Sequence, residues 1–249
     1  MARSRTASLR IQSDADPRDL PAYGIREAAH LLRLPVATLK SWVCGRRYAT
    51  TTGDKFFKPV IELPDRNEPV LSFLNLVEAH VLSAFRRDHD IKLSRIRAAL
   101  KYVQNHFQWK HPLIDQRFET DGVTLFVEKL GSLVDASAGG QIVMETIRPY
   151  FRRLEFKNDA VVRFYPFTRG RIDDSPKWIL VDPRISYGRP SLVRSRVPVS
   201  IIAERFDAGE SIEELATDYA CERLEIEQGL RCERESRVAA CSNQSAMAN

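Results

Sequence analysis

Basic and small polar side chains are concentrated in one stretch of the sequence, residues 20–60. Seven basic residues lie there against two acidic ones, Glu27 and Asp54, which gives a local net charge of +5. Guanidinium and ammonium groups at this density bind phosphates, and small side chains beside them can read base edges. The stretch therefore predicts binding to a polyanion. Its basic residues are Arg26, Arg33, Lys40, Arg46, Arg47, Lys55 and Lys58.

Two short predicted helices position these side chains. The first has apolar residues at the spacing of one helical face: Ile25, Ala28, Ala29 and Leu32. Pro35 begins the second helix, at a position where its missing N–H costs nothing. The inner side of this helix is Val36, Leu39 and Val43, and its outward side is Ala37, Thr38, Lys40 and Ser41. The pair is typical of a helix-turn-helix, although an ordinary helical hairpin in a core has the same pattern.

A β-hairpin is predicted directly after the second helix. Thr52-Gly53-Asp54 is a turn signal, and the residues on both sides of it favour strands. Such a hairpin is called a wing, and its phosphate side would carry Arg46, Arg47, Lys55 and Lys58. Phosphate contacts give affinity and register, whereas base contacts give specificity. Because the second helix offers small side chains and Lys40, we expect modest base reading, with Trp42 in the core or against the DNA backbone.

Two longer helices follow, over residues 72–90 and 96–107. The first, capped by Ser72, is apolar on two faces, a pattern often produced by a neighbour in the same chain and a partner chain. The histidines of this part have no metal-ligand spacing: His80, His89, His106 and His111. We expect His80 on a helix face and the other three at the surface. No metal or cofactor site is predicted.

Residues 23–107 together resemble the MerR-like winged helix-turn-helix domains. The matching residues are Tyr23-Gly24-Ile25, Ala28-Ala29, Leu34-Pro35, Leu39, Trp42, Phe73, Leu76-Val77-Glu78 and the helix from Ile96 to Leu100. The resemblance implies a homodimer that binds double-stranded DNA at a pseudo-palindromic site.

The C-terminal part has the opposite charge. Residues 209–235 carry nine acidic side chains against three arginines, a net charge of −6, which repels a polyanion and suits a protein partner. Helices are predicted over residues 198–206, 211–219 and 224–230, and Ser211-x-x-Glu214 is a capping box for the second of them. We expect a second small bundle that resembles a helix-turn-helix.

The region between the two parts, residues 109–175, is expected to be an α+β connector whose strands could equally extend a dimer interface. It offers an alternating strand at Val123, Leu125 and Val127, a break at Gly139-Gly140, and a hairpin that turns at Asn158-Asp159. The sequence thus predicts a mainly α fold with small β elements. Its parts are a disordered arm (1–20) that could touch phosphates, the winged domain (21–108), the connector (109–175), the helical bundle (176–235) and a disordered tail (236–249).

The segment from residue 182 onward resembles a short bacterial domain that accompanies VapC-type toxins. It matches through Asp182-Pro183, Gly188-x-Pro190, Arg196-x-Pro198, Ala208-Gly209-Glu210-Ser211 and Glu213-Glu214-Leu215-Ala216-x-x-Tyr219. Tyr187 stands where a second glycine is usual and Ser195 where threonine is usual, which would alter the local turn. With its MerR-like part, the chain resembles the larger VapB-type antitoxins over nearly its whole length.

This resemblance implies an antitoxin that binds and silences a PIN-domain ribonuclease, VapC, and represses its own operon. The toxin's site is a carboxylate cluster that holds Mg²⁺ or Mn²⁺, and antitoxins commonly obstruct such sites with an arginine or an apolar segment. Residues from about 178 onward are then expected to hold the toxin. The candidates are Ile226, Leu230, Arg231 and Arg234, followed by Arg194 and Arg196. For each arginine the alternative is a solvent-facing charge of little energetic value.

Two other classes of function are open to such a sequence. A MerR-like dimeric regulator without a toxin could sense a small ligand through the C-terminal bundle. A PIN-domain protein in the adjacent reading frame would favour the antitoxin instead. An enzyme is not expected, because no H-E-x-x-H, G-x-S-x-G or P-loop motif occurs. The four cysteines are scattered and no secretory signal occurs, which favours the reducing cytoplasm. No apolar run approaches the ~18 residues that a membrane helix needs, so no membrane contact is expected.

Overall fold

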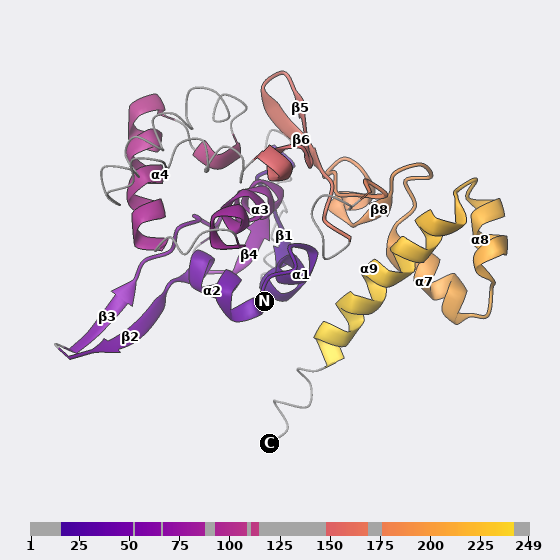
Figure 1. Ribbon diagram of the computed structural model, residues 1–249, viewed down its shortest axis with the longest axis horizontal. Helices are drawn as coiled ribbons and strands as arrows, with labels where there is room; N and C mark the ends of the chain where they lie inside the picture. The colour runs from indigo at the N-terminus through magenta and orange to yellow at the C-terminus, as the bar shows by residue number, and fades with distance from the viewer. Residues whose placement is uncertain are drawn as a thin grey trace, which may run out of the picture.

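The computed structural model describes residues 16–51, 53–65, 67–87, 93–108, 111–114, 148–168 and 176–241 (Figure 1). In these ranges the chain is mainly helical, and its strands form small antiparallel sheets of two strands each, as the predicted fold class requires. None of the helices described has the length and apolar character needed to cross a lipid bilayer. Several predicted features lie outside the described residues: the strand at 123–127, Gly139-Gly140, His89, residues 1–15 of the arm and residues 242–249 of the tail.

The helix-turn-helix follows a short strand. Its elements are β1 (Pro21–Gly24), α1 (Ile25–Leu31) and α2 (Val36–Cys44). Leu34 closes the tight turn with a 2.8 Å hydrogen bond from its backbone N–H to the carbonyl of Ala29, and Arg33 takes a φ of 53°. Leu39 and Val43 face the core as predicted. Val36 does not: it is the first residue of α2 and remains 38% exposed.

The predicted hairpin is confirmed and is fixed to α2. It consists of β2 (Arg46–Thr50) and β3 (Gly53–Phe57), and we call these two strands the wing. Gly45 joins it to α2 with a φ of 74°, and a side chain at this position would collide with the backbone oxygen of Phe57. On the return side, the carbonyl of Trp42 accepts the N–H groups of Val60 at 2.8 Å and Ile61 at 3.2 Å. The wing therefore cannot swing freely about α2.

Helix α3 (Phe73–Arg87) is the centre of the N-terminal half and follows β4 (Val70–Ser72), which pairs with β1. Ser72 caps it as predicted, because its hydroxyl accepts the N–H of Asn75 and its own N–H donates to the Asn75 side chain, both at 3.2 Å. Every side chain from residue 73 to 84 is buried, so both apolar faces are covered. Side chains of α4 (Leu93–Phe107) and of the 3-10 turn η1 (Pro112–Ile114) belong to the same core.

The hairpin predicted within the connector is confirmed. Strands β5 (Leu154–Lys157) and β6 (Ala160–Phe164) turn at Asn158 and Asp159, whose φ angles of 51° and 59° suit a tight hairpin turn. Leu154, Val161 and Phe164 belong to the core that α3 organises. This part of the connector is therefore packed against the N-terminal half.

Residues 16–20, predicted as the end of a disordered arm, are also packed against this core. The carbonyl of Arg18 accepts the N–H of Leu74 at 3.2 Å, and its guanidinium donates to the carbonyl of Val161 at 3.1 Å. The sequence missed this because the partners of Arg18 are far away along the chain.

Two histidines lie in this packed region. His80 is buried on α3, with its Nε2 3.2 Å from the carbonyl of Tyr150 and its ring among aromatic side chains. His111 lies between the carboxylates of Glu78 at 3.1 Å and Asp19 at 3.6 Å. The prediction of a surface position for His111 is therefore wrong, because two distant segments fold over it.

The C-terminal bundle has its own core. Its elements are β7 (Ile179–Leu180), the turn η3 (Ser186–Gly188), β8 (Ser191–Leu192), α7 (Val199–Asp207), α8 (Ile212–Asp218) and α9 (Arg223–Cys241). The predicted capping box is confirmed, since the hydroxyl of Ser211 accepts the N–H of Glu214 at 3.2 Å and the Glu214 carboxylate accepts the N–H of Ser211 at 2.8 Å. Helix α9 continues to Cys241, into the segment expected to be a disordered tail.

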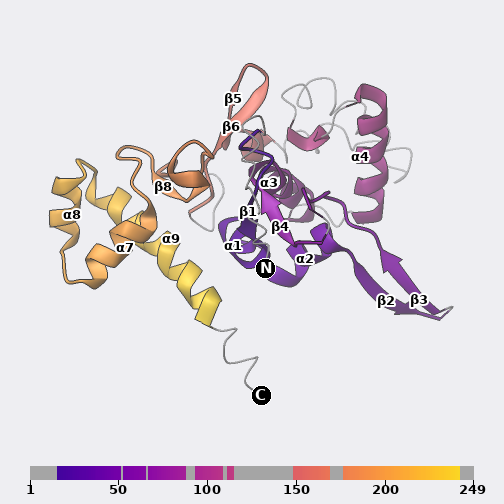
Figure 2. The same cartoon turned by 180° about the vertical axis from the view of Figure 1, so that it is seen from behind.

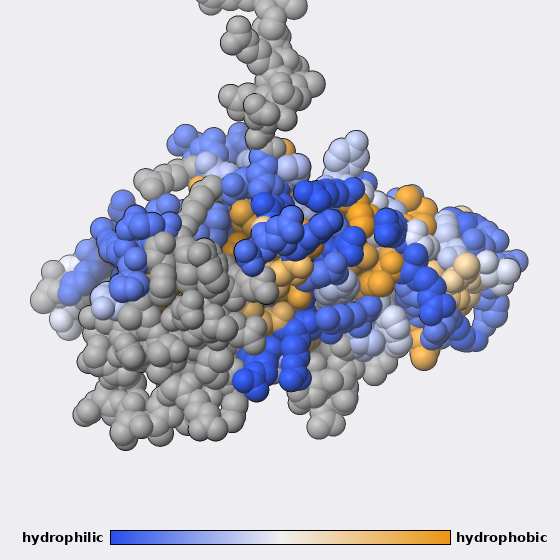
Figure 3. Space-filling model, turned by 90° about the horizontal axis from the view of Figure 1, so that it is seen from above, coloured by the Kyte–Doolittle hydropathy of each residue, from blue (hydrophilic) through white to orange (hydrophobic). Residues whose placement is uncertain are grey.

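The bundle and the wing lie at opposite ends of the molecule, as the views from both sides show (Figures 1 and 2). Helix α9 runs from the bundle toward α1, and these two helices are in contact. Seen from above, the described surface is mostly hydrophilic, with smaller hydrophobic areas between the polar side chains (Figure 3). The helix-turn-helix is thus held between the wing on one side and α9 on the other.

Candidate nucleic-acid interface

The outward side of α2 lies where the sequence predicts it. Ala37 and Lys40 are exposed, and Thr38 and Ser41 are half-buried. The hydroxyl of Ser41 donates a 2.8 Å hydrogen bond to the carbonyl of Thr38, which leaves its oxygen free to accept a bond from outside. Trp42 is 1% exposed and therefore belongs to the core, not to the surface of α2.

The wing does not place all of its predicted cations on one side. Arg46 pairs with Phe57 and Tyr48 with Lys55 across the two strands, so these four side chains share one face. Arg47 lies on the opposite face, because neighbouring residues of a strand point to opposite sides. The expectation that Arg46, Arg47, Lys55 and Lys58 line a single phosphate side is therefore corrected: Arg46 and Lys55 are brought together, and Arg47 is separated from them.

The cations of α2 and the wing are available for a ligand. Lys40, Arg46, Arg47, Lys55 and Lys58 are exposed, and within the described ranges none of these side chains makes an ion pair. Three arginines of the C-terminal bundle behave differently, because Arg194, Arg205 and Arg223 each pair with a carboxylate. Charges that no described residue neutralises retain their attraction for an external polyanion.

Arg97 supports this surface, and the sequence did not single it out. It comes from α4, and its guanidinium donates to the carbonyl of Lys58 at 2.9 Å and lies 5.0 Å from the ring centre of Phe57. The contact fixes the end of β3, although Arg97 does not itself belong to the wing. The sequence pattern places Arg97 on the polar face of a helix, but this pattern does not indicate which residues Arg97 contacts. Tyr48 and Phe56 are also exposed, on opposite faces of the wing.

The two apolar residues predicted to bind the toxin are buried in the bundle. Ile226 is fully buried and Leu230 nearly so, both in the core with α7 and α8. Their helical spacing reflects this internal packing, and neither side chain reaches the surface. A contact with a partner at this end of the molecule would therefore use other residues.

The four arginines predicted to bind the toxin are exposed, but they do not converge on one site. Arg194 pairs with Glu222 at 3.1 Å, and its backbone N–H donates to the buried Glu225 at 3.1 Å. The guanidinium of Arg234 lies 5.4 Å from the ring centre of Phe206. Two arginines differ from these: Arg196 projects from the loop before α7, and Arg231 lines a pocket beside α1.

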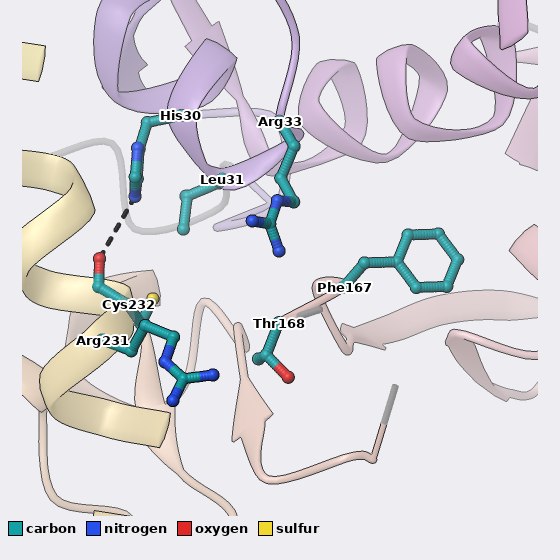
Figure 4. A pocket seen from close by; sticks show the side chains of 7 residues that line it. All are labelled: His30, Leu31, Arg33, Phe167, Thr168, Arg231 and Cys232. Atoms are coloured by element: carbon teal, nitrogen blue, oxygen red, sulfur yellow. Dashed lines mark hydrogen bonds between the residues drawn. The ribbon is translucent and has the colours of Figure 1, made fainter. Parts of the chain in front are cut away.

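The contact between α1 and the C-terminal bundle was not predicted. The Nε2 atom of His30 lies 3.1 Å from the carbonyl of Cys232 on α9 (Figure 4). The hydroxyl of Tyr23, just before α1, donates to the carbonyl of Gly188 at 2.9 Å. Burial raises the pKa of Tyr23 well above its usual value, so the hydroxyl keeps its proton and remains a donor. The helix-turn-helix is thus connected directly to the bundle.

Two family models match the chain, one in the N-terminal half and one in the C-terminal bundle. Residues 21–100 match a family model described as "Putative DNA-binding HTH domain", and residues 179–231 match a "Protein of unknown function" family, DUF433. The first match supports the helix-turn-helix interpretation over the ordinary helical hairpin. It covers the surface formed by α2 and the wing.

Two curated proteins of Mycobacterium tuberculosis are similar to the chain over most of its length. "Putative antitoxin VapB45" is 28% identical, covering 81% of this chain and 89% of its own. "Uncharacterized protein Rv2308" is 26% identical, covering 89% of this chain and 93% of its own. The crystal structure of Rv2018 from the same organism has the same fold, with a TM-score of 0.63 at 23% identity, covering 85% of this chain and 98% of that one. The chain therefore has a helix-turn-helix region of the DNA-binding type, and over most of its length it is similar to a protein described as a putative antitoxin.

Proposed function

We propose that this protein is a VapB-type antitoxin with two binding surfaces. A MerR-like winged helix-turn-helix binds the DNA of its own operon, and the C-terminal bundle binds a PIN-domain toxin. The similarity to a protein described as a putative VapB antitoxin supports the antitoxin role, and the match to a putative DNA-binding helix-turn-helix domain supports the DNA-binding part. The wing and the bundle lie at opposite ends of the molecule, so the two partners need not compete for the same surface.

The observation that carries the DNA-binding part is the set of uncompensated cations on α2 and the wing. Lys40 lies on the outward side of α2, and Arg46 and Lys55 share one face of the wing. With α2 in the major groove, these groups would contact the backbone on either side, while Thr38 and Ser41 would meet the base edges. A homodimer would repeat this arrangement at a second half-site. The short polar side chains imply that phosphate contacts supply most of the affinity.

The toxin-binding part rests on exposed arginines and on the resemblance. A PIN-domain site is a cluster of carboxylates around Mg²⁺ or Mn²⁺, and a guanidinium can form a bidentate pair with a carboxylate. Arg196 is the best-placed of the predicted residues, because it is exposed, and its φ of 59° holds it on a sharply turned loop. The other three arginines would have to exchange their present contacts for contacts with the toxin, or lie at the edge of the toxin interface: Arg194, Arg231 and Arg234. Ile226 and Leu230 support the bundle from within.

A mobility-shift experiment tests the two parts separately. The full chain is titrated against its own upstream DNA, with and without the PIN-domain protein encoded beside it. We expect salt-dependent binding of the DNA alone and a further shift when the toxin is added. Arg196→Ala should weaken the further shift and leave DNA binding unchanged, whereas Lys157→Ala, an exposed cation on β5, should change neither. Specific DNA binding without any toxin complex would support the plain regulator instead.

A further inference from the structure

The start of α2 presents a run of apolar side chains to solvent. Pro35, Val36 and Ala37 follow one another in the chain, and all three are exposed. The sequence pattern predicts Val36 on the inner side of the helix, so its exposure of 38% is revealed only by the structure. Single apolar residues are common on protein surfaces, but a run of three exposed ones is unfavourable unless it has a function. The DNA contacts proposed for α2 do not use Val36.

This run lies at the end of α2 that a helix-turn-helix brings to the bases. In such motifs the N-terminal residues of the second helix contact base edges in the major groove. Pro35 has a φ fixed by its ring, and its carbonyl accepts the N–H groups of Thr38 at 2.9 Å and Leu39 at 3.2 Å. Leu39 is fully buried, so the first turn of the helix is anchored to the core. Val36 and Ala37 are therefore held in fixed positions on the proposed DNA-binding surface.

Cations border the run and indicate a negatively charged partner. Lys40 is exposed and follows Val36 at the i, i+4 spacing, so the two side chains are neighbours on the helix surface. Arg46 and Lys55 share one face of the wing, which follows α2 directly (Figure 1). Within the described ranges, none of these three cations makes an ion pair. A partner that suits this surface therefore combines negative charge with small apolar groups.

The C5-methyl group of thymine is the apolar group that a base displays in the major groove. The side chains of the run have no hydrogen-bond donor or acceptor, so they cannot read the polar edges of the bases. Contact with a methyl group instead removes apolar surface of both partners from water. We propose that Val36, together with Ala37, reads a thymine methyl group in each operator half-site. This inference rests on the proposed DNA-binding function and adds Val36 to the residues that determine sequence preference.

Operator DNA in which uracil replaces thymine tests the proposal, because uracil forms the same base pair but lacks the methyl group. The full chain is titrated against both forms of the operator by fluorescence anisotropy. The parent protein should bind the uracil form about fourfold more weakly for each methyl group that it buries. Val36→Ala should bind the thymine form more weakly than the parent does and should lose less affinity on uracil replacement. This variant should fold, because Val36 is exposed and alanine favours a helix more strongly than valine.

Ile201→Ala is the matched control, since Ile201 is an aliphatic side chain of α7 that is 41% exposed in the C-terminal bundle. It should bind both forms of the operator as the parent protein does. An equal loss on uracil replacement in the parent and in Val36→Ala would overturn the inference, because another residue or the shape of the DNA would then sense the methyl groups. Equal binding of both forms by the parent would also overturn it, while leaving the proposed function intact. Failure to bind any upstream DNA would overturn both.

Discussion

The hydroxyl of Tyr23 donates a 2.9 Å hydrogen bond to the carbonyl of Gly188, which joins the strand before the helix-turn-helix to a turn of the C-terminal bundle. Both residues are buried, and a side chain on Gly188 would collide with this hydroxyl. We expect Tyr23→Phe to lower the free energy of unfolding by about 1–3 kcal/mol, because it leaves a buried carbonyl without a donor. Urea unfolding measures this. Tyr187→Phe is the control, since Tyr187 is 94% exposed, and an equal loss in both variants would contradict the role of the hydrogen bond.

The two cations that share a face of the wing should act as phosphate contacts. Arg46→Ala and Lys55→Ala are each expected to weaken binding to all DNA sequences and to lower the slope of log K against log salt by about one. Arg47→Ala, on the opposite face, should have a smaller effect. Fluorescence anisotropy at several salt concentrations gives the slopes. If all the wing cations could be neutralised without loss of operator binding, the winged-helix assignment would be wrong.

The small side chains on α2 should govern preference among sequences. Ser41→Ala removes a hydroxyl whose oxygen can accept a hydrogen bond from a base, while its own proton is engaged with the carbonyl of Thr38. We expect altered relative affinities for single-base variants of the operator, with little change in binding to random DNA. A competition experiment on a library of operator variants measures this. Identical preferences in Ser41→Ala and the parent protein would exclude Ser41 from base reading.

The hairpin β5–β6 should contribute to acid stability. The Tyr165 hydroxyl, 2.6 Å from Glu155, and then the Arg163 guanidinium hold the pKa of the Glu155 carboxyl below its usual value. This stabilisation is complete above the unfolded-state pKa, near 4.5, and is lost as the pH falls through the lower pKa of the folded state. Tyr165→Phe removes the hydroxyl and keeps the ring that Lys177 approaches at 4.9 Å.

We therefore expect the stability of Tyr165→Phe to depend less on pH on the acid side than that of the parent protein. Urea unfolding at a series of pH values from neutral to below the usual glutamate range measures the difference. A constant offset between the two proteins at every pH would mean that the hydroxyl acts by packing alone.

Local signals in the sequence predicted local structure well. The capping box at Ser211 and Glu214 and the turn at Asn158-Asp159 both depend on residues within a few positions, and both are confirmed. The wing was predicted as a hairpin, but the arrangement of its cations was predicted wrongly. Arg46 and Arg47 are neighbours in β2 and point to opposite sides, and the pairing of Arg46 with Phe57 decides which of them shares a face with Lys55. A shift of one residue would have reversed which cations lie together.

Contacts between distant segments could not be predicted in this way. The pattern of an amphipathic helix predicts that a side chain will be buried, but it does not predict which residues will cover it. Ile226 is an example, because its apolar spacing fits an internal core and a surface for a partner equally well. The partly buried position of His111 and the docking of α9 on α1 depend on residues that are close only after folding. Arg97 was missed for the same reason.

The sharing of one core by α3 and the β5–β6 hairpin has a consequence for dissecting this protein. Phe164 fills space beside His80, although the two are more than eighty residues apart in the sequence. An N-terminal fragment that ends before the hairpin would expose to water the face of α3 that carries His80, and it would tend to self-associate. The DNA-binding half is therefore best isolated together with residues 148–168, as two fragments co-expressed or as one uninterrupted chain.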